Sequence, residues 1–471
     1  MTKTIPWTTT DIIKATKGKL LYGEADHNFS GISIDSRSIT VNDIFVAIQG
    51  QVHDGHNFTE DVIRRGIRGF LIKKDKTGDF PNAEWEKRGL VCVAVNDTTI
   101  ALGDLAAYNR RRSNVSVIAI TGSNGKTTTK DMTAAVVSRR FNTLATSGNF
   151  NNEIGLPLTL LKLNHRHQWA VLELGMNKPG EIGRLGQICL PDVGVIINIG
   201  HAHLEGFDSV DGIMHAKGEL LAKIKPGGTA VLNGDDPKIL QLADKSSTDV
   251  LFYGLSENAA VRALAISEKS FGVSFTLSLP SEQISIDLNT PGNFMVSNAL
   301  AAASAGYLLG STAEEIKAGL EDFKPVQGRM NILTTNNGIH IINDTYNANP
   351  GSMEAAITTL KSLKGRKRGV LVIGDMLELG KYAASMHKKV GSLAARSDIT
   401  KLYVTGEFAD TVAAGARDED MDSRDIFRGT REEILKDLTD HVRPGDWVLV
   451  KGSRAMGMEK IVEGLTSEQL L

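Results

Sequence analysis

Apolar runs alternate with helical segments through the middle of the chain. The runs Val115–Ile120, Ala170–Leu174 and Val193–Ile199 are mostly apolar and rich in β-branched residues. Because they are apolar at successive positions, they predict parallel strands that helices cover on both faces. The middle of the chain is therefore expected to form an α/β domain on a parallel sheet.

Two further blocks flank this part of the chain. Residues 1–112 end in a polar helical segment, Thr98–Arg112, which we interpret as a connector. Before it come the strand-like runs Gly31–Ile34, Ile44–Ile48, Gly69–Ile72 and Leu90–Val95. After the break at Lys324–Val326, a second alternating series predicts strands at Ile339–Ile342, Gly369–Ile373, Lys401–Val404 and Trp447–Val450.

The alternation predicts three α/β domains. Their expected bounds are 1–112, 113–325 and 326–471. The length of 471 residues agrees with this number, because a domain has on average roughly 150 residues.

Composition excludes several classes of protein. The 53 basic and 55 acidic residues give a formal charge of -2, whereas a nucleic-acid binder needs a basic excess. No segment has the length and apolarity of a transmembrane helix, and the N-terminus lacks the pattern of a secretory signal. Cys92 and Cys189 lie in apolar runs and are expected to be buried thiols. We therefore expect a cytoplasmic protein.

A glycine-rich loop follows the first central strand. It runs from Gly122 to Thr128 and opens a helical segment, Lys130–Arg139, which is the context of a phosphate-binding loop. Lys126 would contact the outer phosphates and Thr127 would bind Mg²⁺. Ile120 stands where the usual motif has its first glycine, so an ordinary strand-to-helix turn is the alternative.

The next two central strands also end in polar residues. The strand that starts at Ala170 ends on Glu173, and the strand that starts at Val193 ends near Asn198, with His201 and His203 just beyond. Ligands of open parallel sheets bind beyond the carboxyl ends of the strands. This edge is therefore the expected active site.

Lys217 occupies an unusual position in the segment Asp208–Ile224. It shares the helical apolar stripe of Val210, Ile213, Met214, Leu220 and Leu221. A lysine at such a position extends its amine to solvent, pairs with another polar group or loses its charge. We hypothesise that its amine forms a carbamate with CO₂ and that Glu173, His203 and the modified Lys217 bind a second Mg²⁺.

Nine stretches of the chain together resemble the Mur ligases. They are TGSNGKTTTK (121–130), SGNFNNEIGLPLTLL (147–161), LELGMNKPGEI (172–182), AHLEGF (202–207), AKGE (216–219), QGRM (327–330), NDTYNANPGSM (343–353), GDMLELG (374–380) and KGSRAMGME (451–459). The resemblance runs through all three predicted domains. It implies a first domain that holds the UDP end of a substrate, a central ATPase domain, and a Rossmann-like third domain that closes over the site.

The resemblance also implies roles for individual residues. Nucleotide binding is implied for Gly122, Ser123, Asn124, Gly125, Lys126, Thr127, Thr128, Asn298, Arg329 and Asp344. Catalysis is implied for Lys126, Glu173, His203 and Lys217, with Lys217 as N6-carboxylysine, and metal binding for Thr127, Glu173, His203 and Lys217. Substrate contacts are implied for Ser36, Arg37, Thr146, Asn149, Asn151, Asn152, Tyr346 and Asn347. A further set of residues lies at or just past strand ends of the third domain and is a candidate for binding the charged termini of D-alanyl-D-alanine: Asp375, Glu378, His387, Lys451, Ser453 and Arg454. The adenine contact departs from the family, because Asn293-Phe294-Met295 replaces a common histidine motif.

The implied reaction is amide formation. ATP and two Mg²⁺ ions would drive the joining of D-alanyl-D-alanine to UDP-N-acetylmuramoyl-tripeptide through an acyl phosphate, in the synthesis of peptidoglycan precursors. A monomer is expected. Two alternatives stay open: a Mur-type ligase that adds a single amino acid, and a phosphate-loop switch protein. The switch hypothesis leaves the position of Lys217 unexplained.

Overall fold

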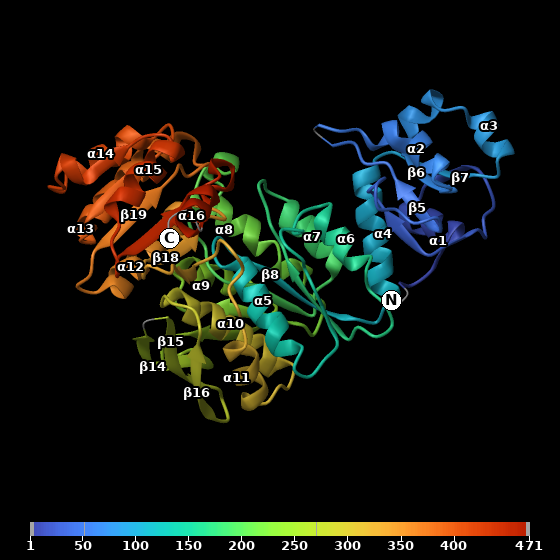
Figure 1. Ribbon diagram of the computed structural model, residues 1–471. Helices are drawn as coiled ribbons and strands as arrows, with labels where there is room; N and C mark the ends of the chain where they lie inside the picture. Colours follow the sequence, from blue (N-terminus) through green and yellow to red (C-terminus); the bar gives the residue numbers. More distant parts are fainter. Residues whose placement is uncertain (1–3, 51, 270, 468–471) are drawn as a thin grey trace.

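The computed structural model describes residues 4–50, 52–269 and 271–467. Three α/β units follow one another, with the N-terminal and C-terminal units on opposite sides of the central one (Figure 1). The predicted α/β class and three-domain architecture are confirmed.

The first unit contains a five-stranded sheet in the order β2-β7-β6-β5-β4. Its strands are β2 (Lys19–Tyr22), β4 (Gly31–Ser33), β5 (Asp43–Val46), β6 (Gly69–Lys73) and β7 (Val91–Val95), and β1 (Trp7–Thr8) pairs separately with β3 (Asn28–Phe29). Its helices are α1 (Thr9–Thr16), α2 (Thr59–Arg64) and α3 (Asn82–Lys87). All four strands predicted before Thr98 are present within two residues of their expected ends.

Helix α4 (Thr98–Arg112) has the predicted bounds and connects the first unit to the central one, in line with its interpretation as a connector. It packs against α1 on one side and against α6 (Gly155–Leu160) and α7 (Glu181–Cys189) on the other. The buried Arg110 donates to the carbonyl of Cys189 (3.0 Å) and to Asp192 Oδ2 (3.1 Å). Its polar residues do not all face solvent, because Arg110 is buried with partners in the central unit.

The central sheet has nine strands in the order β16-β15-β14-β13-β12-β11-β8-β10-β9. The parallel strands are β8 (Ser116–Thr121), β9 (Thr143–Ala145), β10 (Trp169–Glu173), β11 (Val193–Ile196), β12 (Thr229–Asn233) and β13 (Asp249–Gly254). A parallel bridge joins β13 to β14 (Val261–Lys269), which continues antiparallel into β15 (Gly272–Ser278) and β16 (Gln283–Leu288). The prediction missed this antiparallel extension and carried β11 three residues too far.

Helices cover both faces of the central sheet. They are α5 (Lys126–Val137), α6, α7, α8 (Val210–Gly218), α9 (Pro237–Ala243), α10 (Phe294–Leu308) and α11 (Ala313–Glu321). Helix α5 begins at Lys126, four residues before the expected start, so the phosphate loop runs directly into its first turn. Cys92 and Cys189 are free and buried, as predicted.

The third unit contains a six-stranded sheet in the order β17-β18-β22-β19-β20-β21. The strands are β17 (Asn331–Thr334), β18 (His340–Asp344), β19 (Gly369–Ile373), β20 (Lys401–Val404), β21 (Ile426–Arg428) and β22 (Trp447–Lys451); only β17 pairs antiparallel among them. The helices are α12 (Pro350–Lys364), α13 (Ala383–Arg396), α14 (Ala409–Arg417), α15 (Arg431–His441) and α16 (Glu459–Thr466). No helix within the described residues is both long and apolar enough to span a bilayer.

Helices α13 and α14 approach closely through a pair of glycines. A Cβ atom added to Gly391 would lie 1.9 Å from the carbonyl oxygen of Val412, and one added to Gly415 would lie 2.0 Å from that of Lys388. Both contacts are with backbone, which cannot rotate away. The third unit therefore depends on the absence of side chains at this crossing.

We expect Gly391→Ala to lower the free energy of unfolding by about 2–3 kcal/mol, because the overpacked crossing must separate. Urea unfolding measures the change. Gly78→Ala is the control, since an added Cβ there meets nothing within 4 Å. Equal stability of the two variants would show that the crossing is not tightly packed.

Candidate active site

A cavity of about 450 Å³ lies between the central and C-terminal units. The phosphate loop lines one wall, and the segment after β18 together with the start of α12 lines the opposite wall. The predicted site residues in its lining are Ser123, Asn124, Gly125, Lys126, Thr127, Thr128, Asn151, Asn152, Glu173, His203, Asn298, Arg329, Asp344, Tyr346, Asn347 and Lys451. The structure thus brings most of the predicted site together from distant parts of the chain.

The phosphate loop is held by side chains of the loop after β11. The hydroxyl of Ser123 donates to the carbonyl of Gly200 (3.1 Å) and accepts from its N–H (2.8 Å). Asn198 bonds both backbone groups of Asn124, at 2.8 Å and 3.1 Å. Gly125 has a φ of +78°, a conformation that favours glycine, and it precedes the first turn of α5. The start of that helix presents free N–H groups and a positive potential to an anion.

Two lysines converge on one carbonyl of this loop. Lys126 Nζ donates to the Gly122 carbonyl at 2.8 Å, and the fully buried Lys217 Nζ donates to the same oxygen at 3.0 Å. Burial lowers the pKa of Lys126, and it lowers the pKa of Lys217 far below its ordinary value, with the charge of Lys126 adding to the effect. Lys217 thus has the buried environment that its place on the apolar stripe predicts. Its amine contacts the loop and lies outside the cavity lining.

Glu173 and Thr127 form an oxygen-rich pair beneath the loop. Thr127 Oγ1 donates to Glu173 Oε2 (2.8 Å), and Asn151 Nδ2 donates to Glu173 Oε1 (2.8 Å). The buried Thr146 accepts from the Glu173 N–H (3.1 Å) and so fixes the end of β10. A hydroxyl and a carboxylate at the start of a phosphate-loop helix match the oxygen ligands that Mg²⁺ prefers. This pair fits one Mg²⁺ ion.

The second predicted metal set is not assembled in this structure. His203 Nδ1 lies 2.6 Å from Glu378 Oε2 of the C-terminal unit, and this hydrogen bond lowers the pKa of Glu378. Lys217 contacts Gly122 instead, and an unmodified amine offers no oxygen ligand. Within the described residues, no group of three or more His, Cys, Asp or Glu side chains could hold a metal ion.

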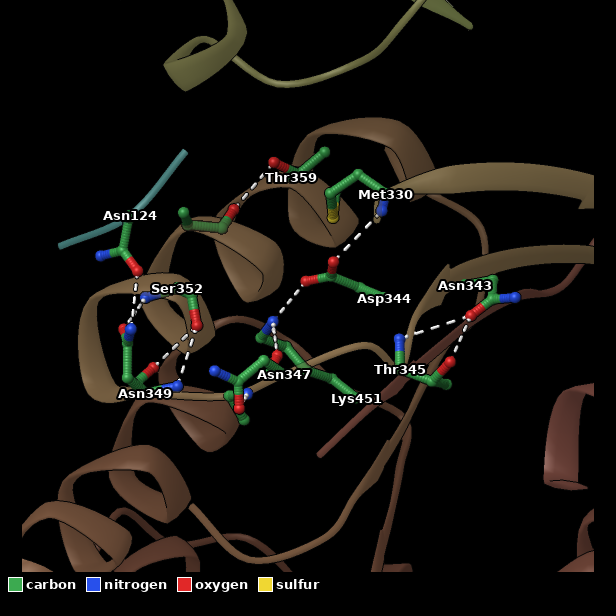
Figure 2. Close-up of polar contacts among 12 residues, drawn as sticks. Asn124, Met330, Asn343, Asp344, Thr345, Asn347, Asn349, Ser352, Thr359 and Lys451 are labelled. Carbon is green, nitrogen blue, oxygen red and sulfur yellow. Dashed lines mark hydrogen bonds and ion pairs between the residues drawn. The ribbon is translucent and has the colours of Figure 1, made fainter. Parts of the chain in front are cut away.

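The C-terminal wall is built around an ion pair. Lys451 Nζ contacts Asp344 Oδ2 and donates to the carbonyl of Asn347 at 2.9 Å (Figure 2). Asp344 Oδ1 accepts from the N–H of Met330 at 3.1 Å. Because Asp344 and Lys451 end the adjacent parallel strands β18 and β22, register places them opposite each other. The pair fixes both segments that face the phosphate loop.

Arg329 extends this wall as a stacked cation. Its guanidinium lies 4.0 Å from the ring centroid of Tyr346, and Arg454 approaches the same ring at 5.9 Å. Nε of Arg329 is buried without a hydrogen-bond partner within the described residues. A cation with an unused donor facing a cavity is suited to an anionic ligand.

Three residues of the third unit that were candidates for binding substrate form hydrogen bonds within the protein. Asp375 accepts from the N–H groups of Glu407 (2.7 Å) and Phe408 (3.1 Å), and Ser453 Oγ accepts from the N–H of Leu377 (2.9 Å). His387 lies inside α13 and not at a strand end. Its ring is buried, with Nε2 accepting from the Met376 N–H (2.9 Å) and Nδ1 donating to the Ala383 carbonyl (2.7 Å). The predicted place of His387 at a strand end is therefore wrong, and both of its ring nitrogens are bonded within the protein.

The remaining predicted residues lie around the cavity or away from it. Ser36 and Arg37 are in the first unit and do not line the cavity, and Arg37 is paired with Asp35. Asn149 is exposed, whereas Asn152 Oδ1 accepts from the N–H of Gly155 at the start of α6. Phe294 and Met295 line the cavity where the family motif differs, and Asn298 Oδ1 accepts from Thr129 Oγ1.

Comparisons with known proteins match all three units. Residues 28–110 match the Mur ligase family catalytic domain, residues 120–306 the Mur ligase middle domain, and residues 328–454 the Mur ligase glutamate ligase domain. The chain is 36% identical over 453 residues to the UDP-N-acetylmuramoyl-tripeptide–D-alanyl-D-alanine ligase of Escherichia coli K12, covering 95% of this chain and 96% of that protein. The chain belongs to the Mur ligase family.

Solved structures of Mur ligases resemble the whole chain. A crystal structure of MurF from Acinetobacter baumannii has a TM-score of 0.90 at 33% identity, covering 98% of this chain and 99% of that one. MurF ligase from Thermotoga maritima, in complex with ADP, has a TM-score of 0.82 at 28% identity, covering 93% and 97%. The similarity therefore includes the mutual arrangement of the three units.

Sequence reasoning about this Mur ligase missed two asparagines in the lining of the site. Asn198 supports the phosphate loop, and Asn349 reaches that loop from α12. Asn198 was noted only as a polar residue near a strand end. Asn349 precedes a proline and caps α12, which is an ordinary helix-start signal, so nothing in the sequence distinguishes its second contact.

The buried His387 of the Mur ligase predicts a pH-dependent stability. Desolvation lowers the pKa of its imidazole, so the folded protein keeps the ring neutral while the unfolded chain binds a proton below about pH 6.5. Stability is therefore lost as the pH falls through that value. Urea unfolding between pH 7.5 and 5.5 should show a slope steeper than that of His387→Gln by up to about 1.4 kcal/mol per pH unit. The exposed His165→Gln is the control, and identical slopes for the wild type and His387→Gln would contradict the prediction.

Proposed function

We propose that this Mur ligase joins D-alanyl-D-alanine to UDP-N-acetylmuramoyl-tripeptide with the energy of ATP. The observation that carries the proposal is the cavity in which a phosphate loop, a buried Thr127–Glu173 pair and the cations of the third unit face one another. Near-full-length relatives that carry this activity in their names, from Escherichia coli and from Bacillus subtilis at 34% identity, support the choice of substrates. The alternatives of a single-amino-acid ligase or a switch protein receive no such support.

In this proposal ATP lies along the cavity with its phosphates at the start of α5. The N–H groups of the loop and the Lys126 amine would bind the phosphates, and Arg329 would reach the nucleotide from the opposite wall. Thr127 and Glu173 would hold Mg²⁺, which supplies charge neutralisation of the phosphates when bound. Asn298 and Phe294 lie on the wall where the nucleoside would rest.

The reaction has two steps. An oxygen of the tripeptide carboxylate attacks the γ-phosphorus, the bond to the β-γ bridging oxygen breaks, and ADP leaves behind an acyl phosphate. The amine of D-alanyl-D-alanine then attacks the acyl carbon, loses a proton, and expels inorganic phosphate. The residues of the chain contribute by holding two anions together against their repulsion, which concentrated positive charge and exclusion of water make possible.

The other substrate contacts are also proposals. Ser36 and Arg37 would hold the UDP end in the first unit, and Asn149 and Asn151 would face the muramoyl peptide. Tyr346, Lys451 and the exposed Arg454 would contact the dipeptide, whereas Asp375 and Ser453 would shape its path through the backbone groups they already bind.

Phosphate release by the purified protein tests the proposed reaction. We expect release above background by at least about a hundredfold only when MgATP, UDP-N-acetylmuramoyl-tripeptide and D-alanyl-D-alanine are all present, because the acyl phosphate needs its acceptor amine. Each peptide substrate alone, and D-alanine in place of the dipeptide, are the controls. Hydrolysis of ATP that does not respond to the peptides would instead indicate a switch protein.

The proposal extends to a carbamate on Lys217, which would supply an oxygen ligand for a second Mg²⁺, and it predicts a dependence on CO₂. The uncharged amine that burial favours is the form that reacts with CO₂. Lys217→Ala should lower kcat roughly a hundredfold or more, and wild-type protein in CO₂-free buffer should lose activity that bicarbonate restores. Lys223→Ala, on the partly exposed turn after α8, is the control. Full activity of both Lys217→Ala and CO₂-depleted wild type would exclude the modification.

A further inference from the structure

Asn349 connects the C-terminal unit directly to the phosphate loop. Its Nδ2 atom donates to Asn124 Oδ1 at 2.7 Å, across 225 positions of sequence. Figure 2 shows the two amides facing each other at the start of α12. The first turn of that helix lies so close that a Cβ added to Gly351 would be 3.0 Å from Asn124 Nδ2. The contact is thus a close approach of two domains at the predicted phosphate site.

On the central side, Asn124 is fixed through its backbone. Its N–H donates to Asn198 Oδ1 (2.8 Å) and its carbonyl accepts from Asn198 Nδ2 (3.1 Å). The backbone of Asn124 therefore belongs to the frame of the central sheet, while its side chain is bound by the third unit. Any displacement of α12 therefore acts on the residue immediately before Gly125, the N-cap of α5.

On the other side, Asn349 is itself held in one orientation. Its Oδ1 accepts from the N–H of Ser352 (2.9 Å), and its own N–H donates to Ser352 Oγ (3.0 Å). Because the cap uses the oxygen of the amide, the NH₂ group is left to point outward at the loop. The preceding segment is secured by Lys451, which bonds the Asn347 carbonyl. Asn349 thus presents a donor with defined direction.

We propose that Asn349 is a positioning residue that sets the phosphate loop for ATP when the C-terminal unit is seated. It acts through Asn124 and does not touch the reacting atoms. The proposal rests on the proposed function for its kinetic consequence, but its effect on nucleotide binding does not require the identity of the peptide substrates. Loss of one such hydrogen bond is expected to change an equilibrium roughly three- to tenfold.

A double-mutant cycle separates this role from simple helix capping. Asn349→Ser keeps a good N-cap oxygen for Ser352 but is too short to reach Asn124. Asn124→Ala removes the acceptor. The two single variants, the double variant and the full-length wild type are compared by the affinity for a non-hydrolysable ATP analogue with Mg²⁺ and by kcat/KM for ATP in phosphate release.

We expect each single variant to lose roughly fivefold in both quantities. The double variant should lose no more than the single variant with the larger loss. Losses that multiply to about 25-fold would overturn the proposal, because they would mean that the residues act independently. Wild-type affinity in Asn349→Ser would also overturn it. If wild type releases no phosphate with the peptide substrates, the proposed function fails while the binding cycle still decides this inference.

Thr430→Ala provides the matched control for a lost cap in the same unit. Thr430 caps α15 with Glu433 in a capping box and lies outside the cavity lining. The control should lower the melting temperature without changing the affinity for the ATP analogue. A fivefold loss of affinity in Thr430→Ala would attribute the effect of Asn349→Ser to general destabilisation and overturn the positioning role.

Discussion

Two buried lysine amines that share one carbonyl group are the constraint on which the site depends. Lys126 and Lys217 both donate to the Gly122 oxygen, and that oxygen carries no full negative charge to balance an ammonium group. Burial lowers the pKa of both amines, and it lowers the pKa of Lys217 so far that the uncharged form is favoured there. The Glu173 carboxylate is already shared by Thr127 and Asn151. An anionic ligand at the loop would compensate this charge better than the protein does.

The same constraint explains how the third unit contacts the central one. It brings Arg329 to the cavity, but its cation Lys451 is neutralised by Asp344 and serves to fix the wall. The direct links between the two units include a neutral amide pair, Asn349–Asn124, the His203–Glu378 hydrogen bond and a backbone hydrogen bond from Glu205 to Glu378. Links of this kind join the units without adding more unbalanced charge at the phosphate loop. The cations that face the cavity therefore remain available to an anionic ligand.

The sequence predicted the parts of this arrangement that depend on local pattern. The strands β19 and β20 have the predicted bounds, and the loop, Glu173 and Asn198 follow strand ends as the apolar runs indicated. Contacts between distant segments could not be predicted in this way. Arg110 of the polar helix α4 is buried and donates to Asp192, which the sequence of the helix does not indicate. Nothing near Glu378 in the sequence indicates its hydrogen bond with His203. The antiparallel strands β14–β16 were missed because they alternate polar and apolar residues, unlike the buried runs used to find the parallel strands.

The substitution of Ile120 for the first glycine of the usual phosphate-loop motif has a structural consequence. Ile120 is still part of β8, and its carbonyl accepts from the N–H of Leu174, so the loop starts later and is shorter. A short loop that lacks this glycine depends on hydrogen bonds from other segments to hold its shape. Asn198 and the backbone of Gly200 supply it within the central unit, and Asn349 supplies it from the third. Because part of the support comes from another unit, the shape of the phosphate loop depends on where that unit is placed.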